Sequence, residues 1–527
     1  MNERLETTEA TLPGGWISVK VKHLLGEPLI NGKSVKTKAG GFPVLRLTCL
    51  KNRRVDLAES KEGAWTQVDA ERYLITSGDF LVSRGNGSIR LVGRGGLVVG
   101  EPPPIAFPDT LIRVRLATQA VVDRYFAHAW DSGAIRAQIE RKAKTTAGIF
   151  KINQRDLSDI SLPVAPRCEQ QRIVEALDSY LSRLDAAEEG LKRVEANLKR
   201  YRASVLKAAV EGRLVPTEAE LARQEGRDYE PASVLLERIL KERRRRWEEA
   251  ELARMEAKGK VPKNEKWKAK YKEPVAPDTS ELPELPEGWT WATLDQLSVL
   301  VRNGISKAPR ELSGVSILRI SAVRALMLDA TDVRFLPGSV LDYRDYVLED
   351  GDLLFTRYNG NPALVGACAR VSSTLCDTVH PDKLIRVRLT GDLLSSDYVA
   401  IASATGESRD HLNRRTRTTA GQAGISGTDL KQMPVPLAPK EEQRRLSLQI
   451  DVVLVQLQQL ERSLKAAGKR IERLRQSILK WAFKGKLVDQ DPNDEPASAL
   501  LERIRAERPT TRRRESRKRG AQMNLDI

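Results

Sequence analysis

The sequence lacks long hydrophobic runs and has few cysteines. No stretch reaches the 18 or more apolar residues typical of a transmembrane helix, and the N-terminal residues contain no apolar segment of the signal-peptide kind. The four cysteines, Cys49, Cys168, Cys368 and Cys376, show no C-x-x-C spacing. This argues against structural zinc and favours reduced thiols in a cytosol. The sequence therefore predicts a cytoplasmic protein without a membrane span.

Motifs for catalysis are also missing. The segment 26–34, GEPLINGKS, places its glycines six residues apart, whereas a phosphate-binding P-loop requires five. The four histidines are scattered, and the proline–aspartate pair at 381–382 is not followed by the acidic-x-lysine triplet of a nuclease. No Asn-Pro-Pro-aromatic tetrapeptide of the amino-methyltransferase kind occurs. The sequence thus predicts a non-catalytic chain with no metal site and no cofactor of its own.

Positive charge is abundant in this chain of 527 residues. Lysine and arginine number 88 against 71 acidic residues, so the formal net charge is +17 and the pI is about 9.6. An arginine-rich C-terminal segment contributes, but basic residues also recur within the globular parts. A polyanionic partner such as nucleic acid is therefore indicated. The length itself predicts two or more domains.

Apolar residues recur at alternating steps of four and three residues along two long stretches. A lone helix cannot bury such a stripe, so each stretch needs a partner helix. The first stretch spans 32 residue steps, or roughly 48 Å at 1.5 Å per residue. We predict an intramolecular coiled coil that acts as a rigid spacer. Its seam residues include Ile173, Leu177, Leu184, Leu191 and Leu198 in the first helix, and Ile450, Val453, Leu457, Leu464 and Ile471 in the second.

The two stretches belong to a duplication at an offset of 273 residues. Trp16 matches Trp289, GDFLVSRGNGSIRLVG at 78–93 matches GDLLFTRYNGNPALVG at 351–366, and TTAG at 145–148 recurs at 418–421. Each copy has strand-like runs separated by Gly and Asn turns, followed by a long helix. The fold class predicted is therefore α/β: two duplicated mixed α/β domains separated by a long two-helix coiled coil.

These repeats divide the chain into six predicted segments. We expect a first globular domain at 1–165, a first long helix at 166–215, a charged helical extension and linker at 216–284, a second globular domain at 285–438, a second long helix at 439–489, and a short helix with a basic disordered tail at 490–527. The charged segment 241–272 and the tail have no role that the pattern assigns.

Two groups of residues in each globular domain are suited to DNA. The first is an Arg-x-Asn-Gly turn, since arginine can pair with guanine and asparagine with adenine in the major groove; the alternative is a purely structural hairpin turn. The second is a basic stretch before TTAG, suited to phosphates, with solubilising surface charge as the alternative. The candidates are Arg84, Asn86, Ser88, Arg141, Lys142, Lys144, Thr145 and Thr146, matched by Arg357, Tyr358, Asn359, Asn361, Arg414, Arg415, Arg417, Thr418 and Thr419.

The ordered set of repeated motifs resembles the DNA-specificity subunit of type I restriction–modification enzymes. The resemblance covers nearly the whole chain and rests on L-P-x-G-W at the start of each domain, G-D and two hydrophobic residues leading to N-G, the E-Q-x-R passage into each long helix, and K-G-K-L-V after the second. It implies that each domain is a target-recognition domain for one half of a bipartite site in double-stranded DNA. It also implies that the two helices of the coiled coil run antiparallel.

The resemblance also implies partners. Two methyltransferase subunits would use S-adenosylmethionine, and for restriction two motor–nuclease subunits would use ATP and Mg²⁺, in a prokaryotic cytoplasm. The chain itself would remain non-catalytic. The alternative is a standalone coiled-coil DNA-binding or architectural protein without enzyme partners. Neither the bases recognised nor the spacer length follows from the sequence.

Overall fold

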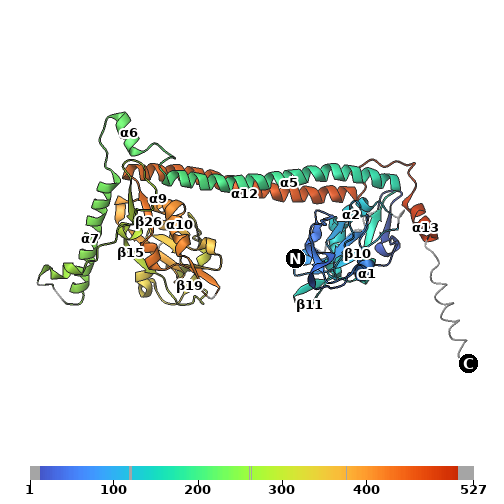
Figure 1. Ribbon diagram of the computed structural model, residues 1–527, viewed down its shortest axis with the longest axis horizontal. Coiled ribbons are helices and arrows are strands. Elements are labelled where there is room, and N and C mark those ends of the chain that lie inside the picture. The colour runs from blue at the N-terminus through green and yellow to red at the C-terminus, as the bar shows by residue number, and fades with distance from the viewer. Residues whose placement is uncertain are drawn as a thin grey trace, which may run out of the picture. The chain divides into compact units, whose positions relative to one another are not determined.

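The computed structural model describes residues 12–117, 121–146, 148–259, 262, 264–375, 377–419 and 421–507. The chain forms two compact units: unit 1 contains 1–192 and 464–527, and unit 2 contains 193–463. Each unit combines a globular mixed α/β part, here called head 1 or head 2, with portions of two long helices (Figure 1). The predicted α/β fold class is confirmed.

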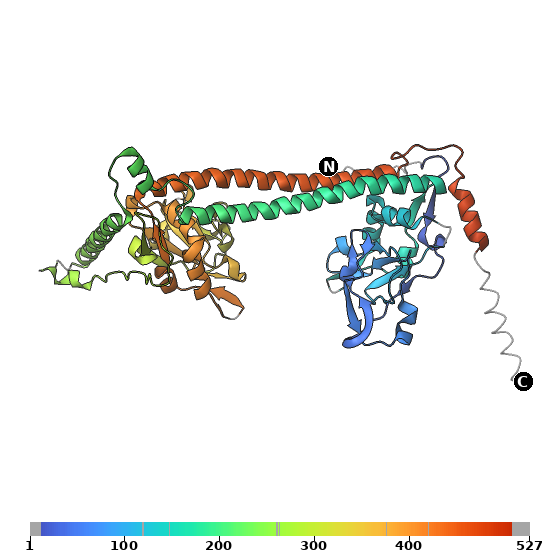
Figure 2. The same ribbon diagram turned by 45° about the horizontal axis from the view of Figure 1, so that its top comes forward.

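The long helices are α5 (Arg167–Val210) and α12 (Lys440–Ala482). In unit 1 the first half of α5 packs against the second half of α12, where Ile173 and Leu177 share a core with Leu479. In unit 2 the second half of α5 packs against the first half of α12, where Val205 shares a core with Ile450. The helices therefore run antiparallel, and both views show them side by side (Figures 1 and 2).

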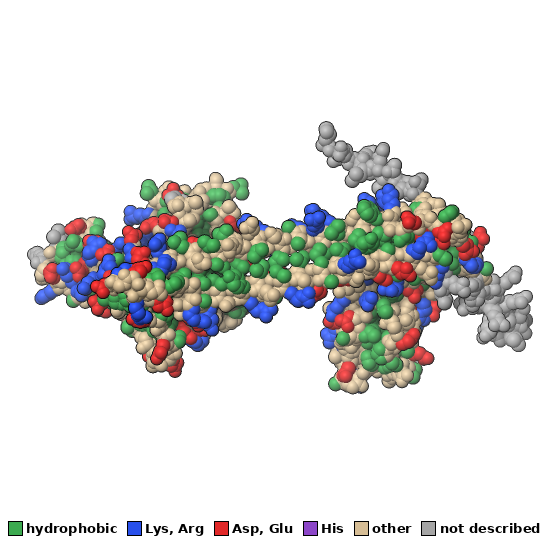
Figure 3. Space-filling model, turned by 90° about the horizontal axis from the view of Figure 1, so that it is seen from above, with side chains coloured by type: hydrophobic (Ala, Val, Ile, Leu, Met, Phe, Trp, Pro, Cys, Tyr) green, Lys and Arg blue, Asp and Glu red, His purple; other side chains and the backbone are tan. Residues whose placement is uncertain are grey.

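The predicted seam is buried unevenly. Ile173, Leu177, Ile450, Val453 and Leu457 are buried. Leu184, Leu191, Leu198, Leu464 and Ile471 are only half-buried, and two further heptad residues, Tyr201 and Leu460, are 54% and 50% exposed. A pair of helices covers its seam from one side only, so apolar surface remains. Hydrophobic side chains accordingly gather along the exposed face of the two helices (Figure 3).

Head 1 is built on a sheet with the strand order β2-β10-β7-β9-β5-β4. The strands are β2 (Ile30–Asn31), β10 (Leu111–Val114), β7 (Phe80–Ser83), β9 (Gly95–Leu97), β5 (Arg54–Val55) and β4 (Leu50–Lys51). Helix α2 (Asp123–Trp130) packs on this sheet, with Phe80 in edge-to-face contact with Phe126 and Trp130. Further elements are the pair β3 (Thr37–Leu45) and β6 (Ser60–Gly63), and helices α1 (Gln67–Ala70), α3 (Gly133–Lys142) and α4 (Gln154–Ser158).

Head 2 repeats this plan with the strand order β15-β23-β20-β22. The strands are β15 (Ser298–Asn303), β23 (Leu384–Leu389), β20 (Leu353–Thr356) and β22 (Cys368–Arg370). Helices α9 (Ser396–Ser403) and α10 (Gly406–Arg415) correspond to α2 and α3, and α8 (Leu294–Leu297) and α11 (Gly427–Lys431) are short. Two antiparallel strand pairs complete the head: β16 (Val315–Leu318) with β19 (Val333–Leu336), and the hairpin of β17 (Val323–Arg324) with β18 (Met327–Leu328).

Buried ion pairs explain two of the repeated motifs. In head 1 the guanidinium of Arg115 donates to both carboxylate oxygens of Asp79, at 2.7 and 2.8 Å. In head 2 Arg388 donates to Asp352 in the same way, at 2.8 and 2.9 Å. Both aspartates also accept backbone N–H groups of the preceding turn. The repeated G-D and L-I-R-V-R-L sequences therefore fasten one turn to the central sheet.

The opening motif ties each head to its long helix. Strand β1 (Ile17–Lys20) pairs with β13 (Ser161–Val164), and β14 (Thr290–Thr293) pairs with β26 (Pro434–Leu437). The indole N–H of Trp16 donates to Glu169 at 2.8 Å, and that of Trp289 donates to Glu442 at 3.1 Å. Burial raises the pKa of both glutamates, since it disfavours their charged form. The repeated tryptophan and the E-Q-x-R glutamate thus act as one contact.

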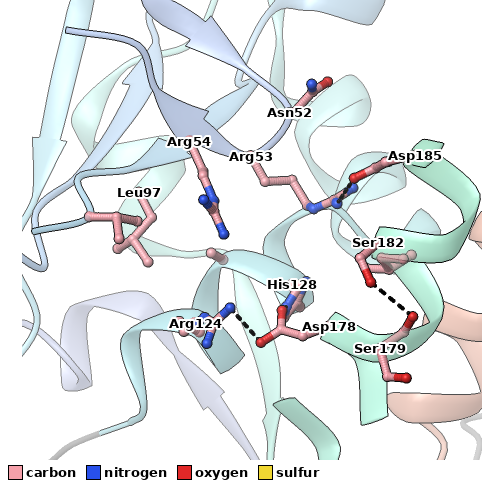
Figure 4. Close-up of a pocket in the computed structure, with 13 residues that line it drawn as sticks. Asn52, Arg53, Arg54, Leu97, Arg124, His128, Asp178, Ser179, Ser182 and Asp185 are labelled. Carbon is pink, nitrogen blue, oxygen red and sulfur yellow. Dashed lines mark hydrogen bonds and ion pairs between the residues drawn. The ribbon is translucent and has the colours of Figure 1, made fainter. Parts of the chain in front are cut away.

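The joint between head 1 and α5 encloses a hollow of about 670 Å³ (Figure 4). Arg53, at the tip of the β4–β5 turn, reaches Asp185 of α5 at 3.6 Å, and His128 of α2 contacts Asp178 at 3.0 Å. In head 2 the position of Arg53 is taken by Leu326, which packs against the hydrophobic core together with Leu454. At this one position the contact between head and helix is therefore ionic in unit 1 and apolar in unit 2.

The charged extension folds onto head 2. It contains α6 (Glu218–Glu225), α7 (Ala232–Glu256) and η5 (Glu265–Lys270). Trp247 stacks on Trp267 with their ring centroids 6.1 Å apart, so these tryptophans pack against each other. Arginines of α7 form ion pairs three or four residues away, such as Arg244 with Glu248 at 3.1 Å. Helix α13 (Ala497–Glu507) follows α12, and the arginine-rich tail lies outside the described residues.

The structure also describes the cysteines, possible metal ligands and possible membrane-spanning helices. Cys49, Cys168 and Cys368 are free thiols, and Cys376 lies outside the described residues. Among the residues described, no cluster of three or more His, Cys, Asp or Glu side chains is arranged to hold a metal ion. None of the described helices is long and apolar enough to cross a membrane.

Candidate nucleic-acid interface

A small sheet in each head brings together the two predicted groups of DNA-binding residues. In head 1 it has the order β11-β12-β8, formed by β11 (Lys144–Thr146), β12 (Ile149–Lys151) and β8 (Gly85–Asn86). In head 2 the same order is formed by β24 (Arg417–Thr419), β25 (Gln422–Gly424) and β21 (Tyr358–Asn359). The Arg-x-Asn-Gly turn and the basic TTAG hairpin are therefore hydrogen-bonded neighbours, although some 60 residues separate them in the sequence.

The pairing register assigns each side chain to one face of this sheet, because residues directly opposite in antiparallel strands share a face. One row is Thr145, Phe150 and Asn86 in head 1, and Thr418, Ala423 and Asn359 in head 2. Phe150 packs against the core and Ala423 is buried in it, so this row faces inward at its centre. The outward row is Lys144, Lys151 and Gly85 in head 1, and Arg417, Gly424 and Tyr358 in head 2.

The two asparagines hold the turns. The side-chain oxygen of Asn86 accepts the backbone N–H of Ser88 at 3.1 Å, and that of Asn359 accepts the N–H of Asn361 at 2.9 Å. Pairing with adenine requires this same oxygen as an acceptor for the adenine amino group. Of the two interpretations that the sequence permits for these asparagines, the geometry favours the structural turn.

The two arginines of the turns are half-buried at the base of the sheet. Arg84 and Arg357 each point one guanidinium nitrogen towards a carbonyl oxygen, of Asp109 at 3.5 Å and of Asp382 at 3.4 Å. The Arg357 guanidinium also lies over the ring of Tyr358, 4.7 Å from its centroid. These long hydrogen bonds leave most of the donor capacity of both guanidiniums unused.

The basic residues lie around the outward row. Arg141 and Lys142 end α3, and Arg414 and Arg415 end α10. All except the half-buried Lys142 are exposed, as are Ser88, Lys144, Thr145, Asn361, Arg417 and Thr418. The side chains of Thr146 and Thr419 lie outside what the structure describes. In head 2 a hollow of about 570 Å³ is lined by Arg415, Arg417, Tyr358 and Gln422 among other residues.

Sequence reasoning missed residues that position this interface. Arg136 of α3 donates to the carbonyl oxygens of Val92 and Ile89, at 2.6 and 2.8 Å, and so holds the 3-10 turn η4 (Ile89–Leu91) that follows β8. In head 2 Arg409 donates to the carbonyl oxygens of Val365 and Ala363, at 2.7 and 3.1 Å, beside η8 (Pro362–Leu364). The sequence did contain a signal for these two residues, because Arg136 and Arg409 are separated by the same 273 residues as the other repeated positions.

Lys151 was also missed. It lies on β12 directly opposite both Lys144 and Gly85, with its side chain exposed. The segment 144–151, K-T-T-A-G-I-F-K, begins and ends with a lysine, and this symmetry is the sequence signal that could have identified Lys151. The outward row of head 1 is thus lined by two ammonium groups, and that of head 2 by a guanidinium and a phenol.

Comparisons with known proteins agree with the repeated motifs. No protein-family model matches the sequence. The EcoKI specificity subunit of type I restriction enzymes, from Escherichia coli (strain K12), is 29% identical over 515 residues, which cover 94% of this chain and 96% of that protein. The StySPI specificity subunit from Salmonella potsdam is 24% identical over 525 residues, with the same coverage of 94% and 96%.

A solved structure shares the fold. A chain from a study of complex assembly and conformational transition in the type I restriction–modification system aligns over 90% of this chain and 99% of its own length. Its TM-score is 0.54 at 16% sequence identity. Over nearly its whole length, the chain is therefore a homologue of the specificity subunits of type I restriction enzymes.

Proposed function

We propose that this chain is the DNA-specificity subunit of a type I restriction–modification complex. Residues 1–165 and 285–438 are then two target-recognition domains, each of which recognises one half of a bipartite DNA site. The supporting observation is that the same small sheet, with an outward basic row and a turn held by asparagine, occurs once in each head. One recognition surface has been duplicated and its side chains have diverged.

The hairpins β11–β12 and β24–β25 have the size and charge that the major groove accepts. The groove admits a two-stranded β-ribbon, and lysine and arginine side chains can contact guanine edges and phosphates there. Residues at the C-terminal ends of α3 and α10 add further positive charge next to the hairpins. The net charge of +17 is consistent with this partner.

We infer that the two long helices, within 166–215 and 439–489, set the distance between the DNA half-sites. Helix α5 has 44 residues, which corresponds to about 66 Å at 1.5 Å per residue. Half-sites on one face of DNA are about 34–36 Å apart per helical turn. An uninterrupted helix of this length is therefore long enough to set a spacing on that scale.

The same helices offer a surface for protein partners. On α12, Leu448, Val452 and Val455 recur at steps of four and three residues and are 55%, 53% and 63% exposed. These positions lie outside the buried seam and stay exposed to water. A row of exposed apolar side chains is typical of a surface that binds another protein. We propose that two methyltransferase subunits, which use S-adenosylmethionine, pack here, and that ATP- and Mg²⁺-dependent motor–nuclease subunits join them for restriction.

Co-expression with a methyltransferase subunit tests this function. We expect the two proteins to co-purify and to methylate adenines within one bipartite sequence, which sequencing of the modified DNA identifies. The chain alone, incubated with DNA, Mg²⁺, ATP and S-adenosylmethionine, is expected neither to methylate nor to cleave. A protein that purifies alone and adds no sequence preference to a methyltransferase would instead support the standalone architectural function.

A chimaera tests the modular arrangement. Replacement of residues 1–165 by the equivalent part of another specificity subunit should change one half of the methylated sequence, and replacement of 285–438 should change the other half. A change of both halves in either chimaera would contradict the proposal. Insertion of one heptad into both long helices adds about 10 Å and should lengthen the unspecified spacer between the half-sites.

A further inference from the structure

One cross-strand pair in the small sheet differs between the two heads in a reciprocal way. In head 1, Gly85 on β8 lies opposite Lys151 on β12. In head 2, Tyr358 on β21 lies opposite Gly424 on β25. Each head therefore pairs one glycine with one large side chain, but the large side chain has moved to the other strand.

The large side chain covers the glycine in both heads. A Cβ built on Gly85 would lie 3.2 Å from Cγ of Lys151, and a Cβ built on Gly424 would overlap the ring of Tyr358. The lysine stem and the tyrosine ring thus occupy the same place on the outward face of the sheet. This place presents an ammonium group in head 1 and a phenol in head 2.

The turn and the loop next to this pair are held in the same way in both heads. The asparagine on the neighbouring inward row caps the turn in each, and an arginine of the following helix, Arg136 or Arg409, holds the loop beyond it. The basic neighbour on the outer strand is Lys144 or Arg417, so its positive charge is retained. At this pair the side chains therefore differ between the heads, whereas the contacts that hold the turn and the loop beside it are retained.

We propose that this cross-strand pair is a specificity-determining position of each head, an inference that rests on the proposed function. The ammonium group of Lys151 can donate hydrogen bonds to a base edge that carries two acceptors. In the major groove these acceptors are O6 and N7 of guanine. The ring of Tyr358 can pack against an apolar group of a base. In the major groove this group is the methyl of thymine. The two heads then differ in base preference because of one exchanged side chain.

The residues that line the hollow in head 2 support a contact between Tyr358 and a base. Tyr358 shares the hollow of about 570 Å³ with Arg415, Arg417 and Gln422. Two guanidiniums are available for the phosphates that flank a base contacted by the ring. The Arg357 guanidinium lies 4.7 Å from the centroid of the ring, and this cation–π contact favours the observed position of the ring.

The test exchanges the pair within the complete complex with its methyltransferase subunits. One variant combines Tyr358→Gly with Gly424→Lys in head 2, and the reciprocal variant combines Gly85→Tyr with Lys151→Gly in head 1. Neither Gly85 nor Gly424 has a positive φ, so the backbone conformation accepts a side chain. Once the covering residue is removed, the nearest neighbour of the new Cβ is a backbone carbonyl oxygen, of Phe150 at 3.3 Å or of Arg357 at 3.2 Å, which has to shift by a few tenths of an ångström. Lys266→Gly, in the extension and exposed, controls for the loss of one lysine.

Methylation mapping should show that each double variant changes one or two adjacent bases of a single half-site and leaves the other half-site unchanged. Affinity for the original half-site should fall by about 5- to 150-fold, the range of one base-specific contact, whereas Lys266→Gly should have no effect. An unchanged methylated sequence, with affinity within about twofold of the parent, would overturn the inference. That outcome would leave the proposed function intact, because the parent complex would still be sequence-specific.

Two conservative variants guard against a trivial loss of folding. Tyr358→Phe retains the ring, and Lys151→Arg retains a donor that matches guanine, so both should keep the parent sequence preference. If they keep it while the double variants show the parent melting temperature but no sequence preference, the pair is confirmed as a contributor to recognition. If Tyr358→Phe changes the preferred base, the ring contact is refuted. A parent complex without any half-site preference would refute the proposed function and this inference together.

Discussion

Arg136 offers a direct test of how the interface in head 1 is positioned. Its guanidinium donates to the carbonyl oxygens of Val92 and Ile89 and pairs with Glu140 at 3.0 Å. The substitution Arg136→Met removes all three interactions and retains an unbranched apolar stem. We expect the 3-10 turn η4 to detach from α3 while the core of head 1 stays folded.

The magnitude follows from the contacts. Each hydrogen bond from a charged donor contributes about 1.5–3 kcal/mol, and the exposed i,i+4 pair with Glu140 adds only about 0.3–0.5 kcal/mol. Because the Arg136 side chain is 26% exposed, the lower end of the range applies. Local opening of 89–92 should then become easier by about 3 kcal/mol, which corresponds to roughly 100-fold faster amide exchange.

Hydrogen exchange followed by mass spectrometry measures this directly. Peptides covering 89–92 should exchange faster in Arg136→Met, whereas those of strand β7 should not change. Arg409→Met is the matched variant in head 2 and should affect 362–365 alone. In the methyltransferase complex, each variant should weaken recognition of one half-site. Unchanged exchange at 89–92 would refute the positioning role of Arg136.

Three further predictions concern packing, pH and salt. Ile450→Ala should destabilise unit 2 by about 2–5 kcal/mol, because the side chain is fully buried, whereas Val455→Ala, 63% exposed, should leave the melting temperature of the isolated chain unchanged and weaken co-purification of the methyltransferase. Burial lowers the pKa of His380 to about 4 from 6.5 in the unfolded chain, so unit 2 should lose stability, about 3 kcal/mol in total, as the pH falls from 6.5 through 4. His380→Phe, which copies Phe107 of head 1, should abolish this loss in thermal unfolding at pH 7 and 5; an unchanged pH profile would contradict the assignment. Lys144→Ala should reduce the slope of log K against log salt by about 0.9 for one phosphate contact, measured by fluorescence anisotropy; an unchanged slope would remove Lys144 from the DNA contacts.

The sequence alone determined the helical framework and the relationship between the two heads. Helical periodicity is local, so the alternating steps of four and three residues through Ile173 and through Ile450 were sufficient to predict two long partner helices. The offset of 273 residues identified which side chains are equivalent, and structural reasons for these matches emerge at Trp16 with Glu169 and at Arg115 with Asp79. The repeated motifs also led to the family whose homologues the comparisons found.

Only the tertiary structure decided how the interface is arranged. Strands β8 and β21 have two residues each, too short for any periodicity to reveal their faces or their partners. Pairing between distant segments placed Lys151 beside Gly85 and turned Asn86 inward to cap its own loop. Strand register depends on long-range hydrogen bonds and core packing, and a shift of one residue would reverse every face. For that physical reason the sequence located the two groups of DNA-binding candidates, and the fold determined which side chains of each group face outward.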